Sequence, residues 1–225
     1  MRLPISRPTR TAGLQRTFQG MVPYEAGLWK HFGALRPLKI ACGCPSRLIQ
    51  RLLNKMFAQL PCELLEVEIP QRARNFLDPE DPDVKRVGAA VRERNFDLGA
   101  LIDDDSQRIG FLDEAGGLIP ATEMASTLAE FMLSEHSEGT IVVENKAWDA
   151  LAPGIQAARG TCIDGGTRQQ SMSRTLQDHA AIFGGGDSSR YWFRESFPTC
   201  DAILSLAKVL ALLSRSDAPF SEMVK

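Results

Sequence analysis

Excess charge, long apolar runs and targeting segments are all lacking in this sequence. Its 225 residues include 26 Lys or Arg and 28 Asp or Glu, which gives a net charge of −2. This balance excludes the strongly basic surface typical of proteins that bind nucleic acid. No run of about 18 apolar residues suggests a membrane span, and the basic segment 2–16 lacks the apolar core of a signal peptide. We therefore expect neither nucleic acid nor a membrane among its partners.

Cysteine and histidine are scarce, and their spacing does not suit metal binding. The five cysteines are odd in number, and Cys42 and Cys44 have no second pair with which to form a zinc site. The three histidines, His31, His136 and His179, have no ligand-like spacing either. We expect the cysteines to be small core residues of a reduced, cytoplasmic protein.

Short apolar segments alternate with amphipathic segments along most of the chain. Residues 46–60 have apolar side chains at helical spacing, whereas residues 62–69 alternate and are rich in Leu, Val and Ile. Strands that alternate with helices favour mostly parallel sheets covered on both faces. We expect strands at 38–42, 62–69, 98–102, 140–143, 161–164, 180–183 and 190–194, and helices at 24–32, 46–60, 82–95, 122–134, 148–158, 169–177 and 201–213.

The pattern of strands and helices runs twice. It predicts an α/β fold made of two consecutive α/β/α three-layer domains with mixed, mostly parallel sheets. We expect an N-terminal arm over residues 1–20, a first domain over 21–110 and a second over 111–225. A hairpin over 109–119, with residues 114–117 as its turn, is expected at the junction.

The most distinctive segment is an acidic turn at the end of the apolar strand 98–102. Asp103, Asp104 and Asp105 follow the strand directly, and the chain leaves the turn through Arg108. Carboxylates crowded at the end of a buried strand repel one another and lose hydration, so a hard cation with oxygen ligands is the simplest compensation. The alternative is a surface turn that Arg108 and water neutralise.

Four stretches together resemble a known enzyme family. Residues 97–108 (DLGALIDDDSQR) are similar to D-L-G-x-x-x-D-x-D-x-D-R, and 183–190 (FGGGDSSR) are similar to F-G-G-E-x-S-G-H. Residues 139–146 (GTIVVENK) resemble a strand that ends in a substrate-contacting lysine, and 218–224 (APFSEMV) resemble an interdomain linker. This order resembles the α-D-phosphohexomutases, the phosphoglucomutase/phosphomannomutase enzymes. Their four domains carry in turn a phosphoserine, a metal loop, a sugar-recognition loop and a phosphate-binding site, and the resemblance over residues 21–225 implies domains two and three.

The resemblance implies a weakened Mg²⁺ site in the acidic turn. Asp103 and Asp105 match the first two of the family's three metal-binding aspartates, and Gln107 stands at the third. A glutamine carbonyl ligates a hard cation but brings no negative charge, and Mg²⁺ dehydrates reluctantly without anionic oxygen.

The sugar-recognition loop departs further from the family. The family's glutamate, serine and histidine correspond to Gly186, Ser188 and Arg190. By resemblance, the expected substrate-binding residues are Lys146, Ser188, Arg190 and Arg108, and the expected ligand is a hexose phosphate. Arg190 suits phosphate or carboxylate; the alternative for Arg190 and Lys146 is simple solvation at the surface.

The family's Ser-His-Asn-Pro-type nucleophile loop has no counterpart in the sequence, so no residue is expected to be catalytic. We expect a phosphohexomutase-like pseudoenzyme that is inactive alone and retains weak binding of a sugar phosphate or a divalent cation. The alternative is one part of an Mg²⁺-dependent intramolecular phosphotransferase whose nucleophile and phosphate-binding domains lie on another chain. A missing first domain would leave an apolar face near Tyr24, Trp29 and Phe32, which a homo-oligomer or a partner chain would cover.

Overall fold

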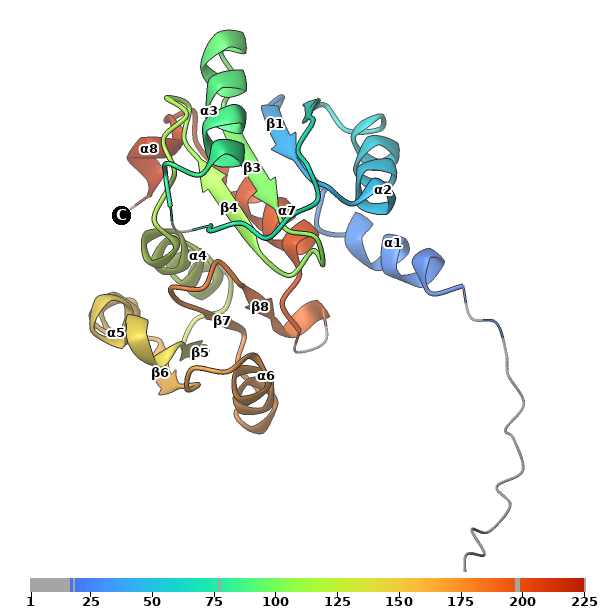
Figure 1. Ribbon diagram of the computed structural model, residues 1–225. Helices are drawn as coiled ribbons and strands as arrows, with labels where there is room; N and C mark the ends of the chain where they lie inside the picture. The colour runs from blue at the N-terminus through green and yellow to red at the C-terminus, as the bar shows by residue number, and fades with distance from the viewer. Residues whose placement is uncertain (1–16, 18, 77, 197–198, 225) are drawn as a thin grey trace, which may run out of the picture.

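The computed structural model describes residues 17, 19–76, 78–196 and 199–224, in which strands and helices alternate along the chain (Figure 1). The strands are β1 Lys39–Gly43, β2 Glu63–Val67, β3 Leu98–Ile102, β4 Ile109–Leu112, β5 Thr140–Val143, β6 Thr161–Asp164, β7 Phe183–Gly185 and β8 Trp192–Phe193. The helices are α1 Met21–Trp29, α2 Arg47–Phe57, α3 Pro82–Arg94, α4 Ala121–Glu135, α5 Trp148–Ala157, α6 Gln169–Asp178, α7 Ala202–Leu213 and α8 Phe220–Met223, with 3-10 turns η1 Asn145–Ala147 and η2 Arg194–Ser196. The predicted N-terminal arm lies almost entirely outside the described residues.

Two four-stranded sheets share one topology. Their strand orders are β2-β1-β3-β4 and β6-β5-β7-β8. In each sheet the first three strands are parallel and the last is antiparallel. The chain thus repeats one arrangement, which confirms the predicted α/β fold with two mixed, mostly parallel sheets.

Alternate side chains of each strand serve opposite faces of its sheet. In the first sheet, Ile40 and Ala100 belong to the core that α2 and α7 complete, whereas Ala41 and Leu101 belong to the core under α3. In the second sheet, Val142 packs with residues of α6, while α4 and α5 cover the other face. Each sheet is therefore the middle layer of three.

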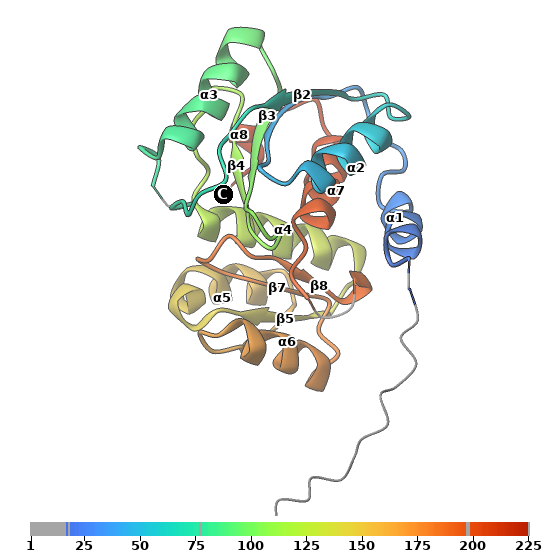
Figure 2. The same ribbon diagram turned by 45° about the vertical axis from the view of Figure 1, so that its right-hand side comes forward.

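Helices α4 and α7 join the two units. Helix α4 packs on β7, whereas α7, which follows the second sheet, packs on β4 of the first, and the two helices contact each other. Figure 2 shows α4 lying between the sheets. Aromatic rings continue the connection, since Phe111 lies 6.3 Å from Tyr191 and Tyr191 stacks on Phe183 at 6.4 Å. One apolar core thus runs through both units.

The strand expected at 180–183 lies further along the chain. Helix α6 ends at Asp178, and Ala180 takes a left-handed φ of 48° in the turn that follows. The chain is extended only from Phe183, so β7 includes two glycines that strand propensity disfavours. Pairing with β5 and β8 overrides that local preference.

The hairpin expected at 109–119 has less strand pairing between its two arms than predicted. Its two arms share a single isolated bridge, between Leu112 and Leu118. Strand β4 pairs instead with β3 across the acidic turn, from Ile102 with Ile109 to Gly99 with Leu112. The division into domains after residue 110 stays a prediction.

The expected apolar face near Tyr24, Trp29 and Phe32 is wrong for the described residues. Leu28 and Phe32 are each 3% exposed, and the half-buried Tyr24 and Trp29 pack on the same core. The Tyr24 hydroxyl also donates to the Asp201 carboxylate at 3.0 Å, where α7 begins. Helix α1 therefore docks on its own chain.

The described residues include no helix with the length and apolarity needed to cross a bilayer. All five cysteines are free thiols. Four of them are buried and Cys162 is half-buried, in agreement with their prediction as small core residues.

Candidate functional site

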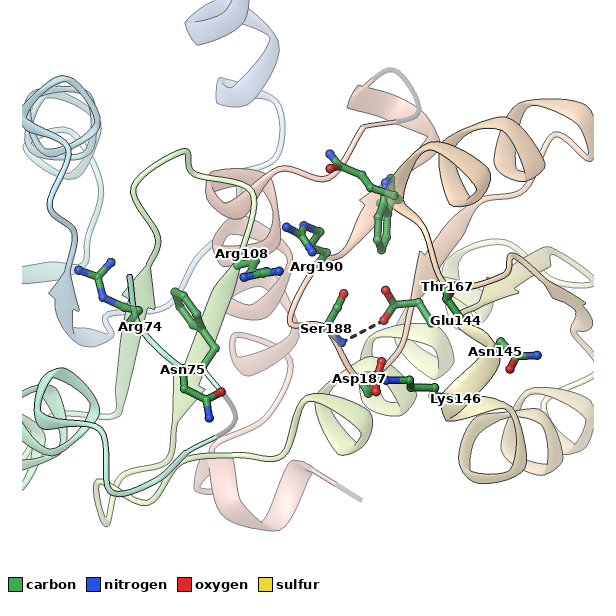
Figure 3. A pocket seen from close by; sticks show the side chains of 13 residues that line it. Arg74, Asn75, Arg108, Glu144, Asn145, Lys146, Thr167, Asp187, Ser188 and Arg190 are labelled. Atoms are coloured by element: carbon green, nitrogen blue, oxygen red, sulfur yellow. Dashed lines mark hydrogen bonds between the residues drawn. The ribbon is translucent and has the colours of Figure 1, made fainter. Parts of the chain in front are cut away.

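A polar pocket of about 360 Å³ lies between the two units, at the carboxyl ends of the parallel strands (Figure 3). Ligands of open α/β sheets commonly bind at this edge. The first unit contributes Arg108 and the loop 74–76, and the second contributes the segment 144–146 after β5 and side chains from 187–192. All four predicted substrate contacts, Arg108, Lys146, Ser188 and Arg190, line this pocket.

Several donors of the pocket have no partner within the described part of the chain. Arg108, Lys146 and Arg190 form no ion pair there. Four buried polar atoms make no hydrogen bond to any described residue: the Nε atoms of Arg108 and Arg190, the Trp192 indole Nε1 and the Ser188 Oγ. A buried donor without an acceptor costs roughly 1–3 kcal/mol. The arrangement therefore favours a ligand that supplies several oxygen acceptors.

Glu144 is the buried carboxylate of the pocket. Its exposed fraction is 7%, and the Ser188 backbone N–H donates to its Oε2 at 3.0 Å (Figure 3). Burial raises the pKa of the Glu144 carboxyl above its ordinary value, although hydrogen bonding from Ser188 opposes the rise. The pocket thus combines unpaired cations with one buried acceptor.

The acidic turn is the loop of the β3–β4 hairpin, and it folds around its own first carboxylate. The backbone N–H groups of Gln107 and Arg108 donate to Asp103 Oδ1 at 2.9 and 3.0 Å. Gln107 N–H also donates to Asp105 Oδ1 at 3.1 Å, so two carboxylates converge on one amide. Burial, with a smaller contribution from Asp105, raises the pKa of the Asp103 carboxyl to about 6.

Arg74 neutralises the outer part of the turn, in place of the predicted Arg108. Its guanidinium is 1% exposed, with Nη1 3.0 Å from Asp104 Oδ1 and Nε 3.2 Å from Asp83 Oδ2. The Arg108 side chain lines the pocket instead. The alternative in which Arg108 and water neutralise the turn is therefore wrong in its choice of arginine.

Residues of the second unit form hydrogen bonds with the Gln107 side chain. Its Oε1 accepts a hydrogen bond from Gln169 Nε2 at 2.7 Å, and the Cys200 thiol donates to the same oxygen at 3.7 Å. A backbone bond adds to this contact, because Ile109 N–H donates to the Ser189 carbonyl at 3.0 Å. The acidic turn is thus fastened to the loop between β7 and β8.

The donors of the acidic turn do not fit the three-aspartate Mg²⁺ site that the resemblance implies. Asp103 and Asp105 supply two carboxylates, and the Gln107 carbonyl already accepts from Gln169. Across residues 17, 19–76, 78–196 and 199–224, no three or more His, Cys, Asp or Glu side chains group to hold a metal ion.

Several known proteins match the chain in sequence. Residues 120–225 match the family model described as phosphoglucomutase/phosphomannomutase, alpha/beta/alpha domain III. The probable phosphoglucosamine mutase of Pyrococcus horikoshii is 28% identical over 149 residues, which is 66% of this chain and 33% of that protein. The phosphoglucosamine mutase of Geotalea daltonii is 26% identical over 196 residues, 85% of this chain and 43% of that protein. The chain is thus similar in sequence to the α-D-phosphohexomutases, and the match to the family model covers its second unit.

Solved phosphohexomutase structures share the fold. A phosphoglucomutase/phosphomannomutase family protein from Burkholderia thailandensis has a TM-score of 0.80 and 22% identity, over 90% of this chain and 45% of that one. A putative phosphomannomutase from Thermus thermophilus has a TM-score of 0.73 and 16% identity, over 94% of this chain and 51% of that one. The chain spans 33% and 43% of the length of the two mutases that its sequence matches.

The sequence alone does not single out two residues of this pocket. Glu144 follows an apolar strand and stands two positions before Lys146. This position at a strand end could have indicated that Glu144 lines the same pocket as Lys146. Trp192 lies within the strand predicted at 190–194, and its ring is fully buried. Only the fold reveals that its indole N–H lies beside the pocket without a hydrogen-bond partner among the described residues.

Proposed function

We propose that this chain binds a hexose phosphate in the pocket between its two units. The observation that supports this function is the set of buried donors on Arg108, Arg190 and Trp192 that lack acceptors within the described residues. A phosphate supplies several strong acceptor oxygens, and guanidinium groups match its geometry. A merely solvated arginine would keep its Nε in water, whereas the Nε of Arg190 is buried.

We also propose that the chain alone does not transfer the phosphoryl group. Phosphoryl transfer depends on positioning and on electrostatic stabilisation, to which bound cations contribute strongly. Here Gln107 is engaged with Gln169, and only Asp103 and Asp105 remain as anionic ligands, so Mg²⁺ binding is expected to be weak.

Titration calorimetry with glucose 1-phosphate tests the binding function. Arg190→Ala is expected to weaken affinity at least about tenfold, because a charge-assisted hydrogen bond contributes roughly 1.5–3 kcal/mol. Arg174→Ala is the matched control, since Arg174 is 83% exposed on α6 and should leave affinity unchanged. Absence of binding heat with the unmodified chain would overturn the proposal.

A mutase assay with glucose 1-phosphate and glucose 1,6-bisphosphate tests the absence of catalysis. We expect no turnover above background. Turnover that Asp103→Ala abolishes would contradict the non-catalytic function and would show that the acidic turn still works.

A second candidate function follows from the length of the relatives. This chain spans 33% and 43% of two mutases, which favours a part of a larger Mg²⁺-dependent phosphoglucomutase or phosphomannomutase. Asp103 and Asp105 would then hold the cation, and Lys146, Ser188 and Arg190 would face the sugar phosphate. Mutase activity that appears only after addition of a polypeptide with a Ser-His-Asn-Pro-type loop would select this function.

We further propose a cytoplasmic location. All five cysteines are free thiols, and reducing compartments keep thiols in this state.

A further inference from the structure

Gly186 and Glu144 compete for the same space beside the pocket. A Cβ atom on Gly186 would lie 2.5 Å from Glu144 Cβ and 2.7 Å from Glu144 Oε2. Gly186 is not among the described glycines with a positive φ, so backbone conformation does not require a glycine here. The missing side chain instead makes room for Glu144.

The position of Glu144 is unexpected in a pocket that binds only an anion. Arg108, Lys146 and Arg190 attract phosphate, whereas a carboxylate repels it. Glu144 is nevertheless buried, and one backbone hydrogen bond from Ser188 holds its Oε2. A carboxylate accepts up to about four hydrogen bonds, so this bond leaves capacity for donors on a ligand.

These two sets of groups select for a ligand with two kinds of chemistry. The donors on Arg108, Arg190 and Trp192 that have no acceptor among the described residues suit the oxygens of a phosphate. Glu144 suits groups that donate hydrogen bonds, and the hydroxyls of a sugar are such donors. A phosphate monoester without hydroxyls would satisfy the first set and leave the second unused.

We propose that Glu144 is the specificity-determining residue of this pocket, with its carboxylate accepting hydrogen bonds from sugar hydroxyls and Gly186 leaving the space that it needs. This inference rests on the proposed binding of a hexose phosphate. The carboxylate comes from the end of β5, while the β7–β8 loop supplies the room for it and the Ser188 N–H that orients it.

Titrations of the full chain against glucose 1-phosphate and methyl phosphate test the inference. Methyl phosphate keeps the phosphate monoester and lacks the sugar hydroxyls. Glu144→Gln is expected to weaken glucose 1-phosphate binding roughly 10- to 100-fold, the usual range for loss of a charge-assisted hydrogen bond. Methyl phosphate should bind as before or more tightly. The new amide oxygen still accepts from Ser188 N–H, so the loop conformation is preserved.

Asp187→Asn is the matched control, because Asp187 is a half-buried carboxylate that lines the same pocket. Loss of its charge is expected to tighten both ligands by a similar factor. An equal loss of preference for glucose 1-phosphate in Asp187→Asn and Glu144→Gln would show a general charge effect and overturn the inference. An unchanged preference in Glu144→Gln would also overturn it, since Glu144 would then act only through Ser188.

Gly186→Ala provides an independent route to the same result. Its methyl group is expected to displace the Glu144 carboxylate and to lower affinity for glucose 1-phosphate more than for methyl phosphate. A folded Gly186→Ala variant with the original preference would contradict the inference. If the unmodified chain binds neither ligand, the proposed function itself fails; if it binds both equally, only the role of Glu144 fails.

Discussion

At the scale of single residues, Gln107 is where hydrogen bonding and metal binding compete. Its carbonyl accepts from Gln169, whereas a carboxylate there would add a third negative charge beside Asp103 and Asp105. Gln107→Asp is expected to raise Mg²⁺ affinity at least about tenfold and to lower metal-free stability by about 1 kcal/mol. Calorimetry with Mg²⁺ and urea unfolding in EDTA measure the two effects. Gln107→Ala should lose stability without gaining affinity, and equal Mg²⁺ affinity in all three proteins would contradict the prediction.

Asp103 gives the turn a pH-dependent contribution to stability. Burial raises the pKa of its carboxyl from 3.8 to about 6 in the folded protein, so the folded state binds its proton more tightly than the unfolded state. The contribution is complete below about pH 4 and is lost as pH rises towards 6 and above. Asp103→Asn removes this titration. We expect the free energy of unfolding of the original chain, relative to this variant, to fall over that window in metal-free urea titrations; a constant difference would refute it.

At this scale, motif spacing predicts which residues line the pocket, whereas contacts between residues far apart in the sequence are not predicted. The four predicted contacts surround one pocket because they lie at or near strand ends, which parallel pairing brings to one edge. Their roles in binding stay predictions. Gln107 and its partner Gln169 are 62 positions apart, and Arg74 is 30 positions from Asp104. Such pairs depend on how loops and units dock, which local sequence patterns do not encode.

At the scale of elements, Asp201 caps the N-terminus of α7 and also accepts a hydrogen bond from α1. Its Oδ1 accepts from the N–H groups of Ile203 and Leu204 at 2.9 and 3.0 Å, and Tyr24 donates to the same carboxylate. Asp201→Ala is expected to lower the free energy of unfolding by about 2 kcal/mol, since both the cap and the Tyr24 contact are lost. Tyr24→Phe removes only the hydroxyl and should cost about 1 kcal/mol. Urea unfolding measures both, and an equal loss in the two variants would argue against the capping role.

The spacing of apolar side chains predicts most helices and strands well, where these side chains alternate along a strand or lie on one face of a helix. The strands at 98–102 and 140–143 have the predicted bounds, because short apolar runs enclosed by polar turns leave little choice of register. Strand β7 is the exception. Two of its residues are glycines, whose strand conformation depends on the neighbouring strands, so no local pattern reveals it.

At the scale of the whole molecule, Phe111 links the units through the shared core. It is 1% exposed, and its ring lies 6.3 Å from both Tyr191 and Phe220. Phe111→Ala is expected to cost about 3–5 kcal/mol and to reduce hydrogen-exchange protection of β1 and β5 together. Leu176→Ala, in the separate core under α6, should affect β5 more than β1. Unchanged protection of β5 in Phe111→Ala would show that the units unfold independently.

The crossing of α7 onto the first sheet makes the two units inseparable. A cut between β4 and α4 would deprive the first sheet of α7 and leave α7 with its apolar face bare, so neither half would have a complete core. We expect a recombination crossover at that junction to be disfavoured for the same reason, because it would expose both interiors. We therefore expect the two sheets to have been inherited as a single block, with the pocket between them passed on intact and changed only residue by residue.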